Sequence, residues 1–138
     1  MQVAVFETNI LISALLWPRG RVFECLDLAR QGSVQSITCE PILNEFVERL
    51  RGKFGLEEQK ARGAAEEVRR ISNIVSISGT LRAVSDVDDD QVVECAVVGS
   101  ATHIVTGDRR HLLPLKEYRG VQIVTAAEFV RLVRGSVT

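Results

Sequence analysis

The sequence of 138 residues falls within the usual range of one folded domain, here 1–138, and its 46% hydrophobic content is enough to build one core. The formal net charge of -1 excludes the strong basic field of a general nucleic-acid binder, so any affinity for phosphates must be local. Only 5% of the residues are aromatic, which disfavours a surface on which bases stack.

The three cysteines and the N-terminal stretch bear on where the protein works. Cys25, Cys39 and Cys95 are an odd number, lie far apart and lack CxxC spacing, which argues against a disulfide framework and against a zinc site. The apolar run at 10–17 is too short for an export signal or a membrane span, and Glu7 interrupts the stretch before it. We therefore expect a soluble, cytoplasmic protein with reduced cysteines and no membrane association.

Strand and helix patterns alternate along the chain. Val3 to Phe6 forms a short apolar run typical of a strand that is buried on both faces, and a helix beginning near Asn9 is ended by Pro18 and Gly20. Further strands are predicted over 34–38, 74–77, 103–105 and 121–124, and further helices over 21–31, 40–50, 56–71, 91–98 and from 125 onward. This alternation predicts an α/β fold, a three-layer α/β/α sandwich with a central parallel sheet.

Acidic residues gather where the predicted strands end. Glu7 and Asp108 each follow a buried strand, and the run Asp86 to Asp90 precedes a helix whose N-terminus faces the same edge in a right-handed connection. Glu45 lies one turn inside its helix, at the border of the apolar stripe. Clustered carboxylates suit Mg²⁺ or Mn²⁺, which lowers the pKa of a bound water and screens the charge of a phosphodiester.

Each of these acids also has a simpler interpretation. A single aspartate of the run 86–90 is about as readily a helix N-cap as a ligand. Asp108 could cap a short turn through Leu112, and Glu7 could be a solvated residue at the sheet edge. The metal-site interpretation therefore depends on the four acidic segments occurring together.

The histidines and basic residues carry less information. His103 and His111 are isolated from any Ser or Cys nucleophile motif, so structural or surface roles are favoured over catalytic ones. Basic groups such as Arg49 and the pair Arg109 and Arg110 are interpreted most simply as solvated helix faces.

Four short motifs together resemble the PIN-domain family. They are Phe6-Glu7-Thr8-Asn9, the segment Asn44 to Leu50, the run Asp86 to Asp90, and Thr106-Gly107-Asp108. Within the family, they are most similar to the toxin components of bacterial and archaeal toxin–antitoxin pairs, the VapC-type ribonucleases. The resemblance extends from Val3 to about Leu132. It implies a PIN-like α/β/α sandwich, a homodimer, and hydrolysis of RNA with Mg²⁺ or Mn²⁺.

The resemblance also assigns roles to individual residues. Glu45 matches the family's helix glutamate, Asp108 matches the acid of the late strand-end motif, and Asp89 best matches the acid of the fourth motif, whose register within Asp86–Asp90 stays open by one or two positions. Glu7, Asp89 and Asp108 would hold the ion, while Glu45 would bind it or position and deprotonate the attacking water. The supporting residues would be Asn9, Thr106, Asp86, Asp88 and Asp90.

One departure from the family's motifs affects the expected activity. The first motif normally begins with aspartate, whereas this chain has Glu7, whose carboxylate stands about 1.5 Å, one carbon–carbon bond, farther from the backbone. Mg²⁺ requires near-octahedral geometry and tolerates little displacement. Three outcomes are open: reduced activity, a shift towards Mn²⁺, and loss of activity.

The sequence therefore favours a metal-dependent ribonuclease, the toxin of a pair, with RNA as substrate and a small antitoxin protein as partner. The alternative is a catalytically silent PIN-like module that binds RNA or protein, with Glu7 as the sign of lost activity. A haloacid-dehalogenase-like phosphatase is disfavoured, because it needs Asp-x-Asp after the first strand where this chain has Glu7-Thr8-Asn9.

Overall fold

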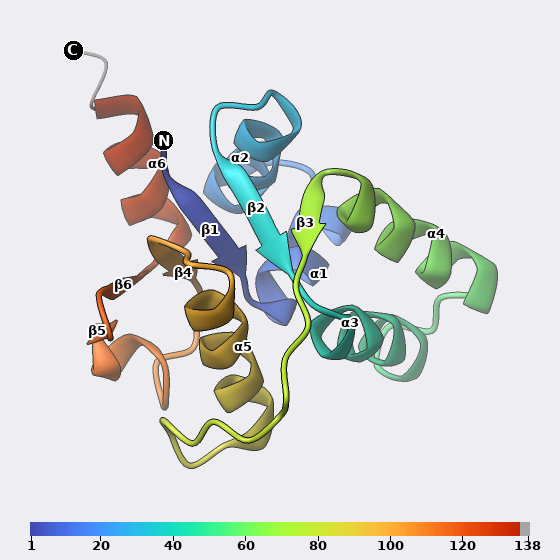
Figure 1. Cartoon of the computed structure of the whole chain (residues 1–138). Coiled ribbons are helices and arrows are strands. Elements are labelled where there is room, and N and C mark those ends of the chain that lie inside the picture. Colours follow the sequence, from blue (N-terminus) through green and yellow to red (C-terminus); the bar gives the residue numbers. More distant parts are fainter. Residues whose placement is uncertain (136–138) are drawn as a thin grey trace.

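A computed structural model describes residues 1–135, so the last three residues of the predicted domain 1–138 lie outside the described residues. Helices and strands alternate through most of the chain, as the sequence pattern predicts (Figure 1). The elements are β1 (Val3–Phe6), α1 (Thr8–Leu16), α2 (Gly20–Arg30), β2 (Gln35–Thr38), α3 (Glu40–Gly52), α4 (Glu58–Arg70), β3 (Ser72–Ile74), α5 (Val87–Val98), β4 (His103–Val105), the 3₁₀ helix η1 (Leu113–Leu115), β5 (Glu117–Tyr118), β6 (Val121–Val124) and α6 (Ala126–Gly135).

The described strands form one sheet in the order β3-β2-β1-β4-β6-β5. All neighbours are parallel except β5 and β6, which form an antiparallel pair at one edge. The central strand β1 pairs with β2 on one side and with β4 on the other, and the register sets Phe6 beside Val105. Because the parallel strands run the same way, the residues that follow β1 and β4 emerge at the same edge of the sheet.

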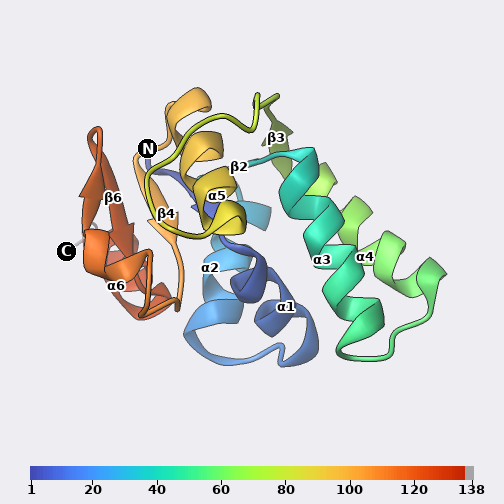
Figure 2. The same ribbon diagram turned by 90° about the horizontal axis from the view of Figure 1, so that it is seen from below.

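Helices cover both faces of the sheet, which confirms the predicted three-layer α/β/α sandwich (Figure 2). Helix α5 packs against β1, β2 and β4 on one face, while α2 packs against α1 and α6 on the other face. The ring of Phe6 in β1 meets the ring of Phe129 in α6 edge to face, with centroids 6.2 Å apart. Helices α3 and α4 pack together at the β3 side, and α3 also contacts α1 and α5.

Three details differ from the predicted elements. Helix α5 begins at Val87 rather than at Gln91. Asp86 caps it, and the acidic residues of its first turn stabilise it by interacting favourably with the helix dipole. The strand predicted over 74–77 is observed as β3, Ser72–Ile74, and the two-residue strand β5 was not predicted. The helix predicted from 125 onward is α6, and a capping box at Thr125 and Glu128 opens it, since the backbone N–H of each residue donates to the side chain of the other, at 3.0 and 3.2 Å.

Two buried carboxylates on α5 hold the irregular segment 75–86 against the helix. Asp90 accepts hydrogen bonds from the backbone N–H groups of Ala83 and Val84, at 2.7 and 2.8 Å. Glu94 accepts from the backbone and hydroxyl of Ser78 and from the N–H groups of the two residues nearby, Gly79 and Leu81. These bonds satisfy backbone groups that have no strand partner, so this segment is positioned by α5.

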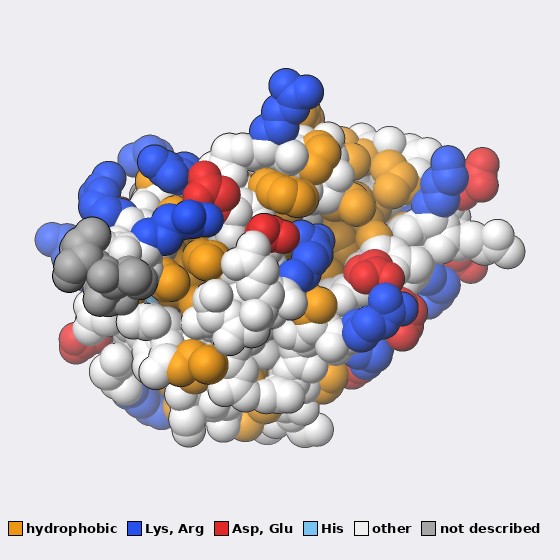
Figure 3. Space-filling model, turned by 90° about the horizontal axis from the view of Figure 1, so that it is seen from above, with side chains coloured by type: hydrophobic (Ala, Val, Ile, Leu, Met, Phe, Trp, Pro, Cys, Tyr) orange, Lys and Arg blue, Asp and Glu red, His pale blue; other side chains and the backbone are white. Residues whose placement is uncertain are grey.

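The surface agrees with the weak overall charge. The side of the molecule opposite to Figure 2 shows separate groups of Lys and Arg side chains, with hydrophobic and acidic side chains between them (Figure 3). Cys25, Cys39 and Cys95 are all buried and free, as predicted. Within residues 1–135, no helix is long and apolar enough to cross a membrane.

Candidate active site

The ends of β1 and β4 bring the first two acids together. Because Phe6 pairs with Val105, Glu7 and Thr106 leave the sheet side by side, and the Glu7 N–H donates to the Val105 carbonyl at 3.0 Å. The hydroxyl of Thr106 donates to the Glu7 carboxylate at 3.3 Å and accepts from the N–H of Asp108 at 3.0 Å. Thr106 therefore links the two acids.

Glu7 also begins the next helix. Its backbone is extended, and its carboxylate accepts a hydrogen bond from the N–H of Asn9 at 2.9 Å, so Glu7 is the N-cap of α1. It is buried, with only 5% of its surface exposed, which contradicts the simpler interpretation of a solvated edge residue. Burial raises the pKa of Glu7, and the hydrogen bonds from Asn9 and Thr106, which lower it, offset only part of this increase.

Asp108 is held by the turn that follows β4. One carboxylate oxygen accepts from the N–H of Arg110 at 3.1 Å, and the other accepts from the N–H groups of His111 and Leu112 at 3.2 and 3.0 Å. The turn-capping interpretation of Asp108 is thus confirmed. Burial would raise the pKa of Asp108, but these three amide bonds outweigh it and hold the pKa below its usual value, so the group is ionised at neutral pH.

The first turn of α5 supplies two more carboxylates. Asp86 is the N-cap of the helix and accepts from the N–H of Asp89 at 3.0 Å. Burial raises the pKa of Asp89 to about 7, and the nearby carboxylates of Asp108, Asp86 and Glu7 raise it further, against a smaller opposing effect of His111. Asp89 is therefore surrounded by like charges.

Glu45 approaches from α3 on the opposite side of the cleft. The hydroxyl of Thr8 donates to its Oε1 atom, and Arg49, one turn along the helix, lies 3.2 Å from Oε2 and also donates to the side-chain oxygen of Asn9 at 2.8 Å. Burial raises the pKa of Glu45 to about 7, and Asp88 contributes to the increase. Helices α3 and α5 thus present carboxylates to each other.

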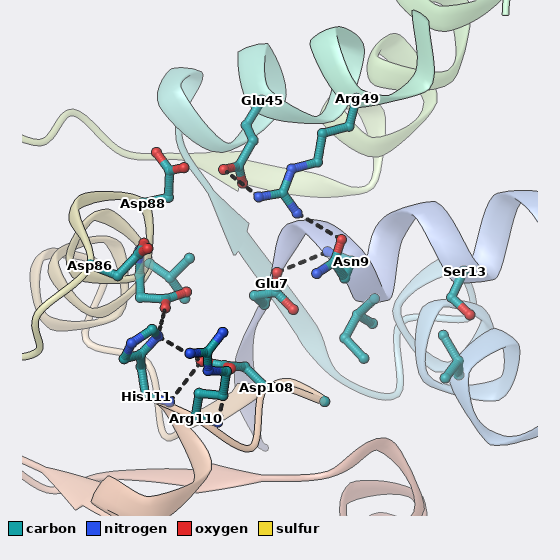
Figure 4. A pocket seen from close by; sticks show the side chains of 15 residues that line it. Glu7, Asn9, Ser13, Glu45, Arg49, Asp86, Asp88, Asp108, Arg110 and His111 are labelled. Atoms are coloured by element: carbon teal, nitrogen blue, oxygen red, sulfur yellow. Dashed lines mark hydrogen bonds and ion pairs between the residues drawn. The ribbon is translucent and has the colours of Figure 1, made fainter. Parts of the chain in front are cut away.

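These residues line one cleft of about 460 Å³ (Figure 4). Figure 4 shows Glu45 and Arg49 on one side, His111 and Asp108 side by side on the other, and Glu7 between them. The structure brings together eight of the nine predicted site residues around this cleft. Those that line it are Glu7, Asn9, Glu45, Asp86, Asp88, Asp89 and Asp108, and Thr106 binds two of them from beneath.

Asp90 is the predicted residue that the structure does not bring into the cleft. Its carboxylate points to the segment before α5 and is held there by Ala83 and Val84. Successive helical residues are about 100° apart, and the step from Asp89 to Asp90 turns the side chain away from the cleft that Asp88 and Asp89 line. Of the run 86–90, Asp86, Asp88 and Asp89 line the cleft, and the match of Asp89 to the family's fourth motif stays a prediction.

Three cleft residues were assigned to other roles from the sequence. His111 lies with its Nδ1 atom 3.1 Å from Asp89 and 3.8 Å from Asp108, although the sequence favoured an isolated, structural histidine. Arg49 and Arg110 also line the cleft, although we interpreted them as solvated helix faces. The signal for His111 was its place three residues after Asp108, on the turn that Asp108 caps.

The donor set fits a divalent metal ion. Carboxylate oxygens come from four separate segments, and burial, together with neighbouring carboxylates, raises the pKa values of Glu7, Glu45 and Asp89, so a bound cation would offset the cost of ionising them. Among the described residues, one set of three Asp, Glu, His or Cys side chains has ligand atoms that all lie within 4.8 Å of one another: Asp86, Asp89 and His111.

The sequence comparisons identify the fold family. A family model of the PIN domain matches residues 3–110, most of the chain. This chain belongs to the PIN-domain family. Membership places the chain in a family of nucleases, and it agrees with the motifs that led us to expect this family. No curated protein matches the sequence.

A solved structure supports the same fold. A chain in the crystal structure of VapBC2 from Rickettsia felis, bound to a DNA fragment from their promoter, superposes on this PIN domain with a TM-score of 0.65. The alignment covers 90% of this chain and 98% of that chain at 14% sequence identity. At that identity, the likeness establishes the shared fold.

Proposed function

We propose that this PIN domain is a metal-dependent endoribonuclease that hydrolyses phosphodiesters in RNA. The observation that carries the proposal is the convergence of Glu7, Glu45, Asp89 and Asp108 from four separate elements on one cleft, where three of them have raised pKa values. Mutually repelling carboxylates weaken the fold unless a cation binds, so their arrangement is explained by a metal-dependent reaction.

Glu7, Asp89 and Asp108 would hold Mg²⁺ or Mn²⁺, with Glu45 at the opposite side of the same cleft. A bound divalent cation supplies Lewis acidity, which makes water a stronger acid and offsets the charge of a phosphodiester. The Thr106 hydroxyl donates to the Glu7 carboxylate and accepts from the backbone N–H of Asp108, which holds these two residues side by side. The N-cap bond to Asn9 fixes the longer side chain of Glu7.

Glu45 would accept the proton of the attacking water. Its pKa of about 7 suits a general base that works near neutral pH. A substantial fraction of the carboxylate is then ionised, and this form is basic enough to accept a proton from water. The Thr8 hydroxyl and the Arg49 guanidinium each bind one oxygen of Glu45 and thereby orient it. Arg49 and Arg110 are the positive side chains in the cleft that could bind the phosphate.

The proposed reaction is tested with purified protein, labelled RNA, and Mg²⁺ or Mn²⁺. Replacing Glu45→Gln keeps the size of the side chain but removes the base, and should lower cleavage by about 100-fold or more. Glu48→Gln is the matched control, because Glu48 lies on the same helix, is exposed, and does not line the cleft. Equal cleavage by both variants would contradict the assignment of Glu45.

Glu7 favours a second candidate, the catalytically silent module that binds RNA or protein. The discriminating variant is Glu7→Asp, which restores the shorter acid of the family's first motif. If the original protein and the Glu7→Asp variant both fail to cleave any RNA with Mg²⁺ or Mn²⁺, the binding function becomes the better proposal. Faster cleavage by the variant would show that Glu7 weakens an otherwise intact site.

We further propose that the protein is the toxin of a toxin–antitoxin pair, acting in the cytoplasm as a single-domain homodimer. The support is the resemblance of its motifs to VapC-type toxins and the shared fold with a chain of the VapBC2 structure. Induced expression should arrest growth, and coexpression of the product of the neighbouring gene should restore it. Light scattering of the purified protein measures whether it is a dimer. Growth that is unaffected by active protein would exclude the toxin role.

A further inference from the structure

We propose that His111 is a metal ligand, which with Asp86 and Asp89 forms a mixed nitrogen–oxygen site that binds Mn²⁺ in preference to Mg²⁺. The proposal rests on the proposed binding of a divalent cation in the cleft, but it does not depend on cleavage of RNA. It goes beyond the carboxylate site because the four predicted acids supply oxygen ligands alone.

The geometry of the three side chains supports this site. Their ligand atoms all lie within 4.8 Å of one another, a spacing that a single ion can bridge, because ligand atoms around one cation at about 2.1 to 2.3 Å are separated by less than this. The Nδ1 atom of His111 already faces the Oδ2 atom of Asp89 at 3.1 Å. The site therefore needs only small side-chain movements to close around an ion.

Hydrogen bonds to backbone N–H groups position Asp86 and His111. Asp86 uses its Oδ1 atom to cap α5, which fixes the side chain at the start of the helix. His111 is fixed through its backbone N–H, which donates to the Oδ2 atom of Asp108 at 3.2 Å. The imidazole and the two carboxylates are about one-third exposed or less and line the same cleft, so an ion can enter from solvent. Preorganised side chains of this kind lose little entropy when an ion binds.

The ligand types decide which ion is favoured. Mg²⁺ is bound mainly by oxygen atoms and keeps several of its water molecules, whereas imidazole nitrogen is a ligand for transition-metal ions. Mn²⁺ accepts carboxylate oxygen and imidazole nitrogen together, so one nitrogen among the ligands favours Mn²⁺ over Mg²⁺. Ligation uses the Nδ1 atom of His111 and leaves the ring proton on Nε2.

The test uses Mn²⁺ as a probe of the whole protein. Pulsed electron paramagnetic resonance detects a nitrogen nucleus bonded directly to Mn²⁺, and the chain contains only two histidines. His103 is buried in β4 against Phe129, away from the cleft. Bound Mn²⁺ should therefore show a nitrogen coupling that changes when histidine is labelled with ¹⁵N, and that is absent in His111→Gln.

Affinity gives the second measurement. His111→Gln should weaken Mn²⁺ binding by at least about tenfold and change Mg²⁺ binding much less, because only Mn²⁺ gains from the nitrogen ligand. Arg109→Gln is the control, since Arg109 lies on the same turn, is exposed and does not line the cleft. It should keep both the nitrogen coupling and the preference for Mn²⁺. Thermal unfolding of each variant confirms that it is folded.

The outcomes separate this inference from the proposed ribonuclease function. Nitrogen coupling without RNA cleavage supports the site and contradicts the ribonuclease. Cleavage with Mg²⁺ by a protein whose bound Mn²⁺ shows no histidine nitrogen supports the ribonuclease and overturns the site, leaving His111 as a residue that positions Asp89. Failure of the folded protein to bind Mn²⁺ also overturns the site, as does unchanged Mn²⁺ affinity in His111→Gln.

Discussion

Helix α5 presents acidic side chains to two different surroundings within two turns. Asp86 and Asp89 face the cleft, where the neighbours of Asp89 include other carboxylates and its pKa is raised to about 7. Asp90 and Glu94 face the segment before the helix, where backbone N–H groups surround them. Burial alone would raise the pKa of Glu94, but the bonds from Ser78, Leu81 and Gly79 outweigh it and hold the pKa below its usual value.

The contrast shows that the partners of a buried carboxylate decide what it does. Glu94, whose hydrogen bonds are satisfied, fixes a segment that has no regular structure. Asp89 faces like charges instead, so it costs stability in the metal-free protein and gains a favourable partner when a cation binds. The same residue types on one helix therefore serve folding on one face and, in our proposal, metal binding on the other.

The largest expected effect is the loss of RNA cleavage in Asp89→Asn. The substitution removes a proposed metal ligand, so cleavage should fall by more than about 100-fold. Loss of a residue that only hydrogen-bonds a metal ligand typically has a smaller effect. Without metal the variant should be about 1 kcal/mol more stable at pH 8, because it no longer buries an ionised carboxylate beside other acids. Initial rates on labelled RNA and urea unfolding measure the two effects. Lost cleavage together with lost stability would show that Asp89 is needed for the fold instead.

The opposite result is expected for Glu94→Gln. The substitution leaves several buried N–H groups poorly paired, so the free energy of unfolding should fall by about 3 kcal/mol, or roughly 10 °C in Tm. Urea unfolding at pH 7 measures the change. Glu57→Gln, at an exposed position, should stay within about 0.5 kcal/mol of the original protein. A Glu94→Gln variant as stable as this control would contradict the structural role of Glu94.

The pH dependence of stability should reveal the same carboxylate. Because the folded pKa of Glu94 lies below the value of 4.5 that it has when unfolded, the unfolded state binds more protons between these values. The contribution of Glu94 is therefore complete above pH 4.5 and is lost as the pH falls through the folded pKa. Urea unfolding between pH 3 and pH 7 should show the original protein and Glu94→Gln converging in acid. A constant difference across that range would contradict the prediction.

A slightly smaller effect is expected from adding the metal ion. At about 100 times its Kd, a cation that binds only the folded state stabilises it by about 2.7 kcal/mol. This increment should be present in the original protein and in Glu94→Gln, because Glu94 faces away from the cleft, and it should be lost in Asp89→Asn. Thermal unfolding with and without Mn²⁺ measures it. An equal increment in all three proteins would place the ion elsewhere.

Local signals account for the parts of the structure that the sequence predicted well. The strands at 103–105 and 121–124 were predicted with their observed bounds, because buried parallel strands are continuous apolar runs. The convergence of Glu7 and Asp108 followed from the rule that parallel strands end at one edge. Helix α5 was predicted to begin too late, since Asp86 caps it and the aspartates that follow interact favourably with the dipole of its first turn.

Contacts between distant segments account for what was missed. His111 lies 22 residues from Asp89 in the sequence, and their contact depends on how the turn after β4 meets the start of α5. Arg49 looked like a solvated helix residue because its bond to Asn9 spans 40 residues. Periodicity gives the face of a helix but not the side chain that lies opposite, so the acids could be predicted and their basic partners could not.

The smallest expected effect belongs to Glu128, a carboxylate that is satisfied but exposed. It accepts the N–H of Thr125 in the capping box of α6, as Glu94 accepts its amides, but water can replace that bond. Glu128→Gln should therefore lower the free energy of unfolding by only about 0.5 to 1 kcal/mol, measured by urea unfolding at pH 7 beside Glu57→Gln. If burial sets the size of the effect, the loss must be well below that of Glu94→Gln. Equal losses in the two variants would mean that the hydrogen bonds to backbone amides alone set the loss of stability. Burial would then not explain the contrast between the carboxylates of α5.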